Sequence, residues 1–133
     1  MTRIARPAPA FAAALAAALL AACASDYHYS RLDGRRYNLT AIDTHPLQVA
    51  SVDGQSTPLT GPVLVEPGTH KLAVQTFPDK VHRFGVERRV TLAVKPCTHY
   101  YLVAVKSTPL SSDYDVKVDY EEPVAGCSAP ASK

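Results

Sequence analysis

The chain divides into two stretches with different patterns of hydrophobic and polar residues. Residues 11–22 read FAAALAAALLAA and carry no polar side chain. After residue 23, apolar residues instead recur at every second position in short runs, and turn-forming residues separate these runs. Alternation with a period of two is typical of half-buried β-strands. Because no segment after residue 23 shows a helical period, the pattern predicts an all-β domain.

Six runs carry the strand pattern most clearly. Residues 101–105 are apolar on both faces, which predicts a central, buried strand. Residues 114–120 alternate strictly, which predicts one packed face and one solvated face. The remaining runs lie at 47–52, 63–65, 69–77 and 90–94.

Two pairs of turn residues punctuate the first half of this region. Asp53-Gly54 follows the run at 47–52, and Pro67-Gly68 follows the run at 63–65. Proline fixes its own φ and glycine supplies a positive φ, so the second pair predicts a type II turn and a hairpin with the next run. About seven strands in about ninety residues suffice for a small antiparallel β-sandwich, which we predict over residues 37–127.

The amino-terminal stretch has the features of an export signal. Arg3 and Arg6 precede the apolar run, which is shorter than the roughly 20 residues that span a bilayer and within the range of about 7–15 for a signal-peptide core. The run ends in Leu20-Ala21-Ala22-Cys23, which resembles the bacterial lipobox, a leucine and two small residues before a cysteine. This resemblance predicts a lipoprotein signal peptide over residues 1–22.

The lipobox resemblance implies cleavage between Ala22 and Cys23 and attachment of lipid to the Cys23 thiol, with the new amine also acylated. Each buried methylene adds about 0.8 kcal/mol of membrane affinity, so two or three acyl chains, such as palmitate, hold a protein stably. Ala24 and Ser25 follow in place of an aspartate, which by the sorting rule of such proteins implies the outer membrane, with the domain facing the periplasm. The alternative is an ordinary secretory signal followed by a chance cysteine.

Removal of the signal changes the charge of the chain. The loss of Arg3 and Arg6 from the 14 basic residues leaves 12, equal to the 12 acidic residues, so the mature chain has no net formal charge with neutral histidines. Nucleic-acid binding needs a basic domain or a basic face. We therefore expect no nucleic-acid partner.

Cys97 and Cys127 remain when Cys23 is assigned to lipid. An exported domain lies in an oxidising compartment, where cysteine pairs form disulfides. We predict a structural bridge, which on the chain-entropy model stabilises the domain by roughly 3–4 kcal/mol. A redox or metal-binding pair is the alternative, but the two residues form no C-x-x-C motif.

The segments that flank the predicted domain are polar. Residues 23–36, beginning with the lipidated cysteine, are predicted to be a flexible tether that spans on the order of 20 Å. Tyr27 and Tyr29 within it either rest at the membrane interface or begin the first strand. Residues 128–133 are predicted to be a disordered tail.

Part of the strand pattern resembles a known family. The segments VEPGTHKL at 65–72, VTLAV at 90–94 and YYL at 100–102 resemble PEGA-type domains, which are small β-sandwich modules of bacterial surface and envelope proteins. Residues 118–127, VDYEEPVAGC, are similar to the closing segment of small uncharacterised proteobacterial lipoproteins. The resemblance implies a β-sandwich in the envelope and no particular activity.

Catalytic and metal-binding spacings are missing from the sequence. The histidines stand singly, without H-x-x-x-H or H-E-x-x-H motifs, and no G-x-S-x-G or S-x-x-K motif occurs. We therefore expect a protein that is not an enzyme and that uses no cofactor or metal. The histidines are His28, His45, His70, His82 and His99.

The segment 77–85, FPDKVHRFG, gathers aromatic, basic and titratable side chains between two strands. Loops on rigid sandwiches often carry binding sites, so this segment is a candidate binding loop. The favoured structural interpretation is a long hairpin loop whose two phenylalanines fold back onto the sheet. The candidate residues are Phe77, Lys80, His82, Arg83 and Phe84.

Together these features predict a non-catalytic envelope lipoprotein that binds other envelope proteins or serves in an assembly. The alternative is a module that binds glycan or a small ligand. The chain has no tryptophan, and most of its tyrosines fall inside predicted strands, so the sequence predicts no aromatic groove for a sugar.

Overall fold

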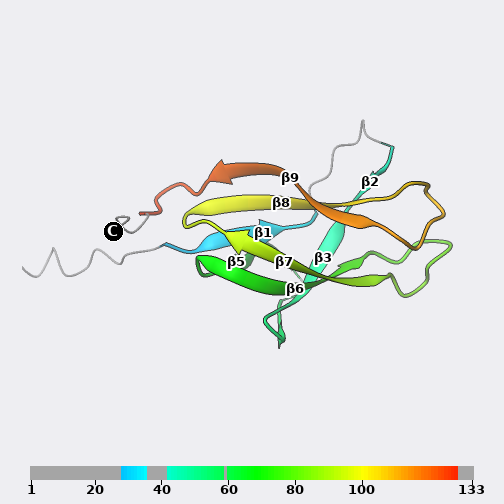
Figure 1. The fold of residues 1–133 in the computed structure, drawn as a ribbon, viewed down its shortest axis with the longest axis horizontal. Helices are drawn as coiled ribbons and strands as arrows, with labels where there is room; N and C mark the ends of the chain where they lie inside the picture. Colours follow the sequence, from blue (N-terminus) through cyan, green and yellow to red (C-terminus); the bar gives the residue numbers. More distant parts are fainter. Residues whose placement is uncertain (1–27, 36–41, 59, 129–133) are drawn as a thin grey trace, which may run out of the picture.

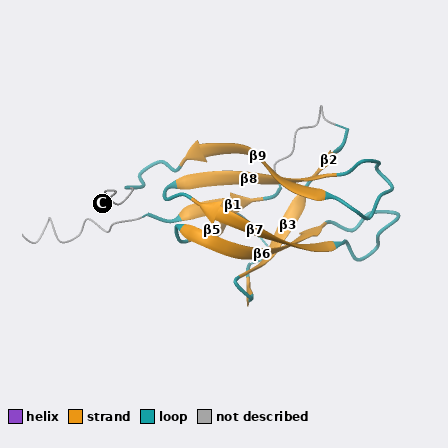
Figure 2. Ribbon diagram, in the orientation of Figure 1, coloured by secondary structure: helices purple, strands orange, loops and turns teal. Residues whose placement is uncertain are grey.

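The computed structural model describes residues 28–35, 42–58 and 60–128. Within these ranges the chain forms nine strands and no helix, and the strands are arranged in two sheets (Figures 1 and 2). The predicted all-β sandwich is therefore confirmed. The signal peptide at 1–22, the lipidation site Cys23 and the tail from residue 129 lie outside the described residues.

The first sheet, sheet A, is organised around the central strand β8. Strand β9 pairs with β8 along its whole length, while β1 and β2 pair with opposite halves of it. Strand β5 pairs with β1 and forms the edge. The strands are β1 (Ser30–Asp33), β2 (Thr44–His45), β5 (Val63–Val65), β8 (Thr98–Val105) and β9 (Asp115–Pro123).

The second sheet, sheet B, is antiparallel throughout, with the strand order β4-β3-β6-β7. The turn between β3 and β4 contains Asp53 and Gly54, whose φ angles of 50° and 82° suit a tight hairpin turn. The predicted turn at this position is confirmed. The strands are β3 (Leu47–Val52), β4 (Gln55–Ser56), β6 (Gly68–Thr76) and β7 (Glu87–Val94).

The two sheets enclose one apolar core. Strand β8 contributes residues to it and is buried on its outer face as well, which confirms the prediction of a central strand. Tyr114 closes one end of the core, and its hydroxyl donates a hydrogen bond to the Val86 carbonyl at 2.7 Å. The largest fully buried side chains of the core are Leu32, Leu47, Leu72, Val74 and Leu102.

Strand β1 lies inside the segment predicted to be tether, so that prediction is wrong for Ser30–Asp33. The strand runs parallel to β8, in contrast to the expected antiparallel architecture. Its inward residues are Ser30 and Leu32, both fully buried. The Ser30 hydroxyl donates to the Lys95 carbonyl and accepts the Thr98 N–H at 2.9 Å. Because one of the two buried positions of β1 is a hydrogen-bonded serine, the strand lacks the apolar alternation on which the prediction relied.

The hairpin predicted at Pro67-Gly68 is also wrong. Strand β5 pairs with β1 in sheet A, whereas β6 pairs with β3 and β7 in sheet B. The chain therefore crosses from one sheet to the other at this point. The apolar patterns of both strands were identified correctly, but they do not contain the information about which neighbour each strand pairs with.

The strict alternation predicted for residues 114–120 is broken in the structure. The pairing of β8 with β9 shifts register between Tyr101 and Leu102, opposite Asp119. Tyr120 then lies across from Tyr101 and is half exposed. The bulge therefore turns the second half of β9 over relative to the first half.

Candidate functional site

Three loops lie together at one end of the sandwich, which we call the distal end. They comprise residues 42–43, 77–86 and 106–114. Strand pairing places two of them together, because Thr44, Val105 and Asp115 are adjacent in sheet A. Lys106 Nζ lies 3.8 Å from Asp79 Oδ2, which brings in the third loop. Figure 1 shows these loops far from the point where the described chain begins.

The distal end carries most of the exposed large apolar side chains. Eight such side chains are exposed among the described residues, and five of them lie in these three loops. Concentrated exposed apolar groups mark surfaces that bind other molecules, whereas single ones need no explanation. The five residues, which we call the distal apolar patch, are Ile42, Phe77, Val81, Phe84 and Leu110.

The favoured expectation that both phenylalanines fold back onto the sheet is wrong for Phe84. Phe84 is 86% exposed and Phe77 is 36% exposed. The backbone around Phe84 is fixed, since its carbonyl accepts a hydrogen bond of 2.6 Å from Gln75 Nε2. Gly85 follows with a φ of 71°, and the resulting turn directs the Phe84 side chain outward.

The candidate binding loop, residues 77–85, is held by the carboxylate of Asp79. Its Oδ1 accepts the N–H groups of Val81 at 2.8 Å and His82 at 2.5 Å, and the Asp79 N–H donates to the His82 carbonyl at 3.0 Å. These bonds, the one from the His82 N–H first, lower the pKa of Asp79 below its ordinary value. The loop is therefore a closed turn that presents Val81 at its tip.

Beneath the loop lies a small cluster of polar side chains that sequence analysis did not identify. Lys106 is only 4% exposed and points its ammonium toward Asp79. Burial and the neighbouring charge of Lys106 lower the pKa of His45, whose Nε2 is buried without a hydrogen-bond partner. His45 ends strand β2, and Asp79 and Lys106 lie in two separate loops, so no spacing in the sequence predicts their meeting. They attach the loop to sheet A.

The candidate residues of the binding loop thus divide into two sets. The exposed set comprises Phe77, Lys80, Arg83 and Phe84. His82 is half-buried and packs against Asp79, with its Nδ1 atom 3.3 Å from the carboxylate. The sequence missed Ile42 and Leu110, which complete the patch from two other loops. Among the described residues, no group of three His, Cys, Asp or Glu side chains is placed to hold a metal ion.

The predicted cysteine pair lies at the opposite end. The Sγ atoms of Cys97 and Cys127 are at disulfide-bonding distance, and their Cα atoms are 5.5 Å apart. The Cys97 N–H donates to the carbonyl of His28, the first described residue, at 3.3 Å. The chain therefore enters the domain beside this bridge, at what we call the proximal end.

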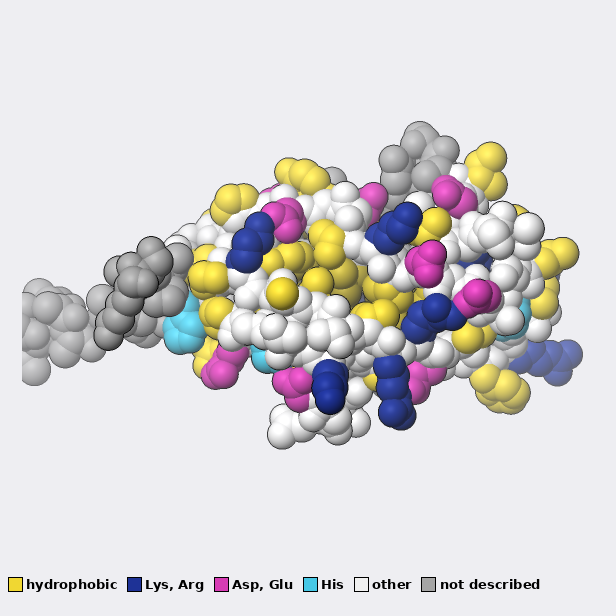
Figure 3. Space-filling view, in the orientation of Figure 1, with side chains coloured by type: hydrophobic (Ala, Val, Ile, Leu, Met, Phe, Trp, Pro, Cys, Tyr) yellow, Lys and Arg dark blue, Asp and Glu magenta, His cyan; other side chains and the backbone are white. Residues whose placement is uncertain are grey.

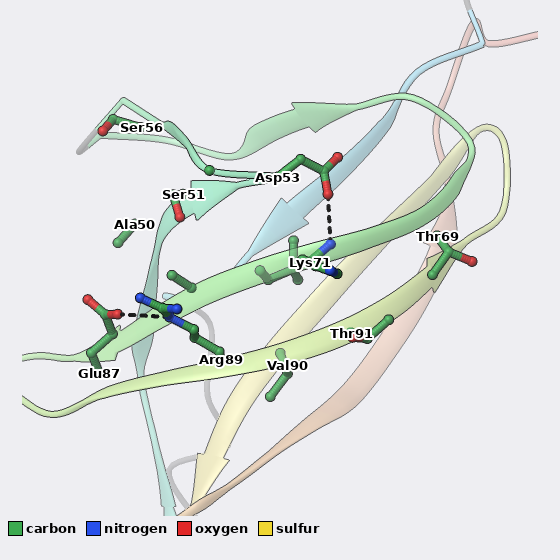
Figure 4. A pocket seen from close by; sticks show the side chains of 13 residues that line it. Ala50, Ser51, Asp53, Ser56, Thr69, Lys71, Glu87, Arg89, Val90 and Thr91 are labelled. Atoms are coloured by element: carbon green, nitrogen blue, oxygen red, sulfur yellow. Dashed lines mark hydrogen bonds and ion pairs between the residues drawn. The ribbon is translucent and has the colours of Figure 1, made fainter.

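A broad trough crosses the outer face of sheet B. It has a volume of about 970 Å³ and is lined by small and charged side chains. Figure 4 shows Glu87 and Arg89 together at one part of the wall and Asp53 at another, where its carboxylate accepts the Lys71 N–H at 2.8 Å. None of the described residues that line it is aromatic.

Comparison of the chain with family models, with curated proteins and with solved structures gives no significant match. The resemblance to PEGA-type domains therefore stays an expectation from the sequence. In the part of the chain that the structure describes, no helix is long and apolar enough to cross a membrane.

Proposed function

We propose that this chain is a non-catalytic lipoprotein of the bacterial envelope whose domain binds a protein partner through the distal apolar patch. The observation that carries the proposal is the position of the patch. Five exposed apolar side chains lie in three separate loops at one end of the sandwich. Isolated exposed apolar residues would be scattered over the surface instead.

The composition of the distal end suits a protein interface. Protein interfaces combine an apolar, often aromatic, centre with a polar rim. Here Phe84 supplies an exposed aromatic ring, and Lys80 and Arg83 are exposed beside it in the same loop. The hydrogen bonds of Asp79 hold the loop before any partner arrives, which reduces the ordering cost of binding.

The predicted lipid anchor fits this arrangement. Cys23 precedes His28 by five residues, and His28 lies at the proximal end. Lipid on Cys23 would therefore hold the domain by the end opposite the distal apolar patch. The patch would remain accessible to an envelope protein in the periplasm.

Crosslinking in cells tests the proposal. The full chain, with a photoreactive residue in place of Arg83, should give discrete crosslinked species that disappear when Phe84→Ser and Leu110→Ser are combined. Leu64→Ser is the matched control, because Leu64 is an exposed aliphatic residue on β5, away from the distal end. Crosslinks that survive the double substitution, or disappear equally in the Leu64→Ser control, would contradict the proposal.

A second candidate function is the binding of glycan or a small ligand in the trough on sheet B. Its volume of about 970 Å³ lies within the usual range for ligand sites, about 300–1,000 Å³. Against it, the lining contains none of the aromatic rings on which sugars commonly stack. Amide shifts at Lys71 and Arg89 on titration with peptidoglycan fragments, with no shift at Phe84, would favour this candidate.

A further inference from the structure

The five edge strands of the described sandwich, β2, β4, β5, β7 and β9, differ in how well they are protected from pairing with another strand. An unpaired edge is blunted when it is short, charged, bulged or interrupted by proline. Strands β2 and β4 have only two residues each, and β5 has three. Strand β9 has nine, but it carries the bulge at Asp119, the charge of Lys117 and a terminal Pro123.

Strand β7 has none of these protections over most of its length. It has eight residues without proline, glycine or register shift. Its charges are confined to the first three positions, and the segment Val90–Val94 is uncharged. Within the described ranges β7 pairs only with β6. It is therefore the one long edge there that is open to another strand.

The hydrogen-bonding pattern shows which groups β7 offers. The Thr76 N–H donates to the Val86 carbonyl at 3.1 Å, and bonding toward the neighbour alternates along an antiparallel pair. Val90 and Leu92 therefore direct their backbone groups toward β6. Arg89, Thr91 and Ala93 direct their N–H and C=O groups away from the sheet.

The side chains along this opening are apolar and incompletely covered. Val90 and Leu92 face the core and are only half-buried, and Val118 on the facing edge strand β9 is 40% exposed. Figure 3 shows a band of apolar surface running between charged groups along this side of the molecule. Ion pairs of Arg88 with Asp113 and of Lys95 with Glu121 join the two edges at the ends of the band.

We propose that a second copy of this chain pairs with the β7 edge, antiparallel, with Thr91 of each copy on the twofold axis. Charge favours this register. In this register Glu87 lies opposite Lys95 of the second copy, and Arg89 lies opposite Ala93 of the second copy. A register centred on Arg89, two residues earlier, would instead place the two copies of Arg89 directly opposite each other. Like charges in that position destabilise a strand pair.

The same register also continues the core. Val90 lies opposite Leu92 of the second copy, so each half-buried side chain gains an apolar neighbour on the inner face. The two copies of sheet B then form one eight-stranded sheet. Such an interface is self-complementary, as a closed twofold dimer requires.

The symmetry agrees with attachment to one membrane. The twofold axis of an antiparallel strand pair within a sheet stands perpendicular to that sheet. With the sheets parallel to the membrane, both proximal ends reach the same surface, and both distal ends stay free at the sides. The proposal is therefore independent of the distal apolar patch, and either can fail without the other.

Sedimentation of the full chain carrying Cys23→Ser, which removes the lipid site, tests the pairing. We expect a concentration-dependent dimer whose dissociation constant rises at least tenfold with Thr91→Lys, because two ammonium groups then face each other. Thr69→Lys is the matched control, an exposed threonine on the inner strand β6 of the same sheet, and should leave the dimer intact. A protein that stays monomeric, or a dimer that is unaffected by Thr91→Lys, would overturn the proposal.

Crosslinking by a single new cysteine tests the register. In the same background, Thr91→Cys should form an intermolecular disulfide, since directly opposite Cα atoms lie at about 5.5 Å. Ala93→Cys should not, because the two copies of residue 93 are separated by four residues of strand, about 14 Å. Equal crosslinking of both variants, or crosslinking of Ala93→Cys alone, would exclude this register and with it the proposal.

Discussion

Cys97 and Cys127 lie with their Cα atoms 5.5 Å apart and their sulfur atoms at bonding distance, although 30 positions separate them. Around them the Val124 N–H donates to the Cys97 carbonyl at 2.9 Å, and the Cys127 N–H donates to the Val124 carbonyl at 3.3 Å. Val124 is buried. The bridge, two hydrogen bonds and one apolar side chain thus hold the segment that follows β9 across the proximal end.

Replacement of both cysteines by serine should lower stability without changing the fold. Burial of Val124 alone holds the segment after β9 weakly, and the chain-entropy model assigns roughly 3–4 kcal/mol to a loop of this size. For a domain this small, each kcal/mol lost lowers Tm by roughly 4–8 °C. We expect a β-rich far-UV spectrum and a much lower Tm, and reduction of the parent should give the same Tm. Two titratable thiols in the denatured, unreduced Cys23→Ser protein would show that no bridge forms.

The lipobox resemblance predicts the behaviour of Cys23→Ser in cells. Without the thiol there is no site for diacylglycerol, so the variant should incorporate no labelled palmitate. An unprocessed precursor or a soluble product should accumulate instead. Ser25→Ala, next to the cleavage region, is the control and should retain the label. Incorporation of palmitate into the Cys23→Ser variant would contradict the assignment.

The residues after Cys23 lead to a separate prediction about membrane location. Ala24 and Ser25 stand where an aspartate would favour retention in the inner membrane. Density-gradient separation of membranes should recover the mature protein with outer-membrane markers. Ser25→Asp should move part of it toward the inner-membrane fraction. Recovery of the parent only with inner-membrane markers would overturn the outer-membrane placement.

The strands that alternate over five or more residues were predictable from the sequence, as was the three-residue apolar strand β5, whereas β1, β2 and β4 were not. The bounds of β3 agree with the predicted run at 47–52, and β8 was identified as central because both of its faces are apolar. Strand β1 was not predicted because one of its buried residues, Ser30, is polar. Strands β2 and β4 have two residues each, too few to show any period.

The distal end was predictable only in part, for a related reason. The loop at 77–85 stood out because its aromatic and basic residues are close together in the sequence. Ile42 and Leu110 are single apolar residues in polar surroundings and carry no pattern. Only the fold brings their loops to the end of the sandwich that carries Phe84, since β2 and β9 both pair with the same end of β8.

Two glycines with similar backbone angles should differ in their tolerance of alanine. Gly54 and Gly85 have φ of 82° and 71°, so alanine is strained at both, at a cost of order 1–3 kcal/mol. A Cβ on Gly54 meets open space, but a Cβ on Gly85 would lie 2.1 Å from the Thr76 carbonyl oxygen. We expect Gly85→Ala to lose about 1–3 kcal/mol more than Gly54→Ala in urea unfolding. Equal losses would show that the close approach to Thr76 does not exist.

A histidine–carboxylate pair makes stability depend on pH. His70 Nδ1 lies 2.6 Å from Asp53 Oδ2, and its Nε2 lies 2.7 Å from the Glu66 carbonyl oxygen. With acceptors at both ring nitrogens, the protonated ring fits best. The hydrogen bond to Asp53 raises the pKa of His70 above its ordinary value of 6.5, and the bond to His70, followed by that from the Lys71 N–H, lowers the pKa of Asp53 below 3.8.

The direction of each shift sets the pH range in which the pair stabilises the fold. The contribution of His70 is complete below its unfolded-state pKa and is lost as pH rises through its raised folded-state pKa. The contribution of Asp53 is complete above its unfolded-state pKa and is lost as pH falls through its lowered folded-state pKa. Both are therefore present between about pH 4 and 6.5.

Asp53→Asn should reveal this dependence, because asparagine tolerates the φ of 50° at this position and removes only the charge. The free energy of unfolding should fall more at pH 5.5 than at pH 9, measured by urea titration at each pH. Asp115→Asn, at an exposed position on β9, is the control and should show no such difference. A loss from Asp53→Asn that is equal at both pH values would mean that Asp53 acts only as a hydrogen-bond acceptor for the Lys71 N–H and not as the partner of a protonated His70.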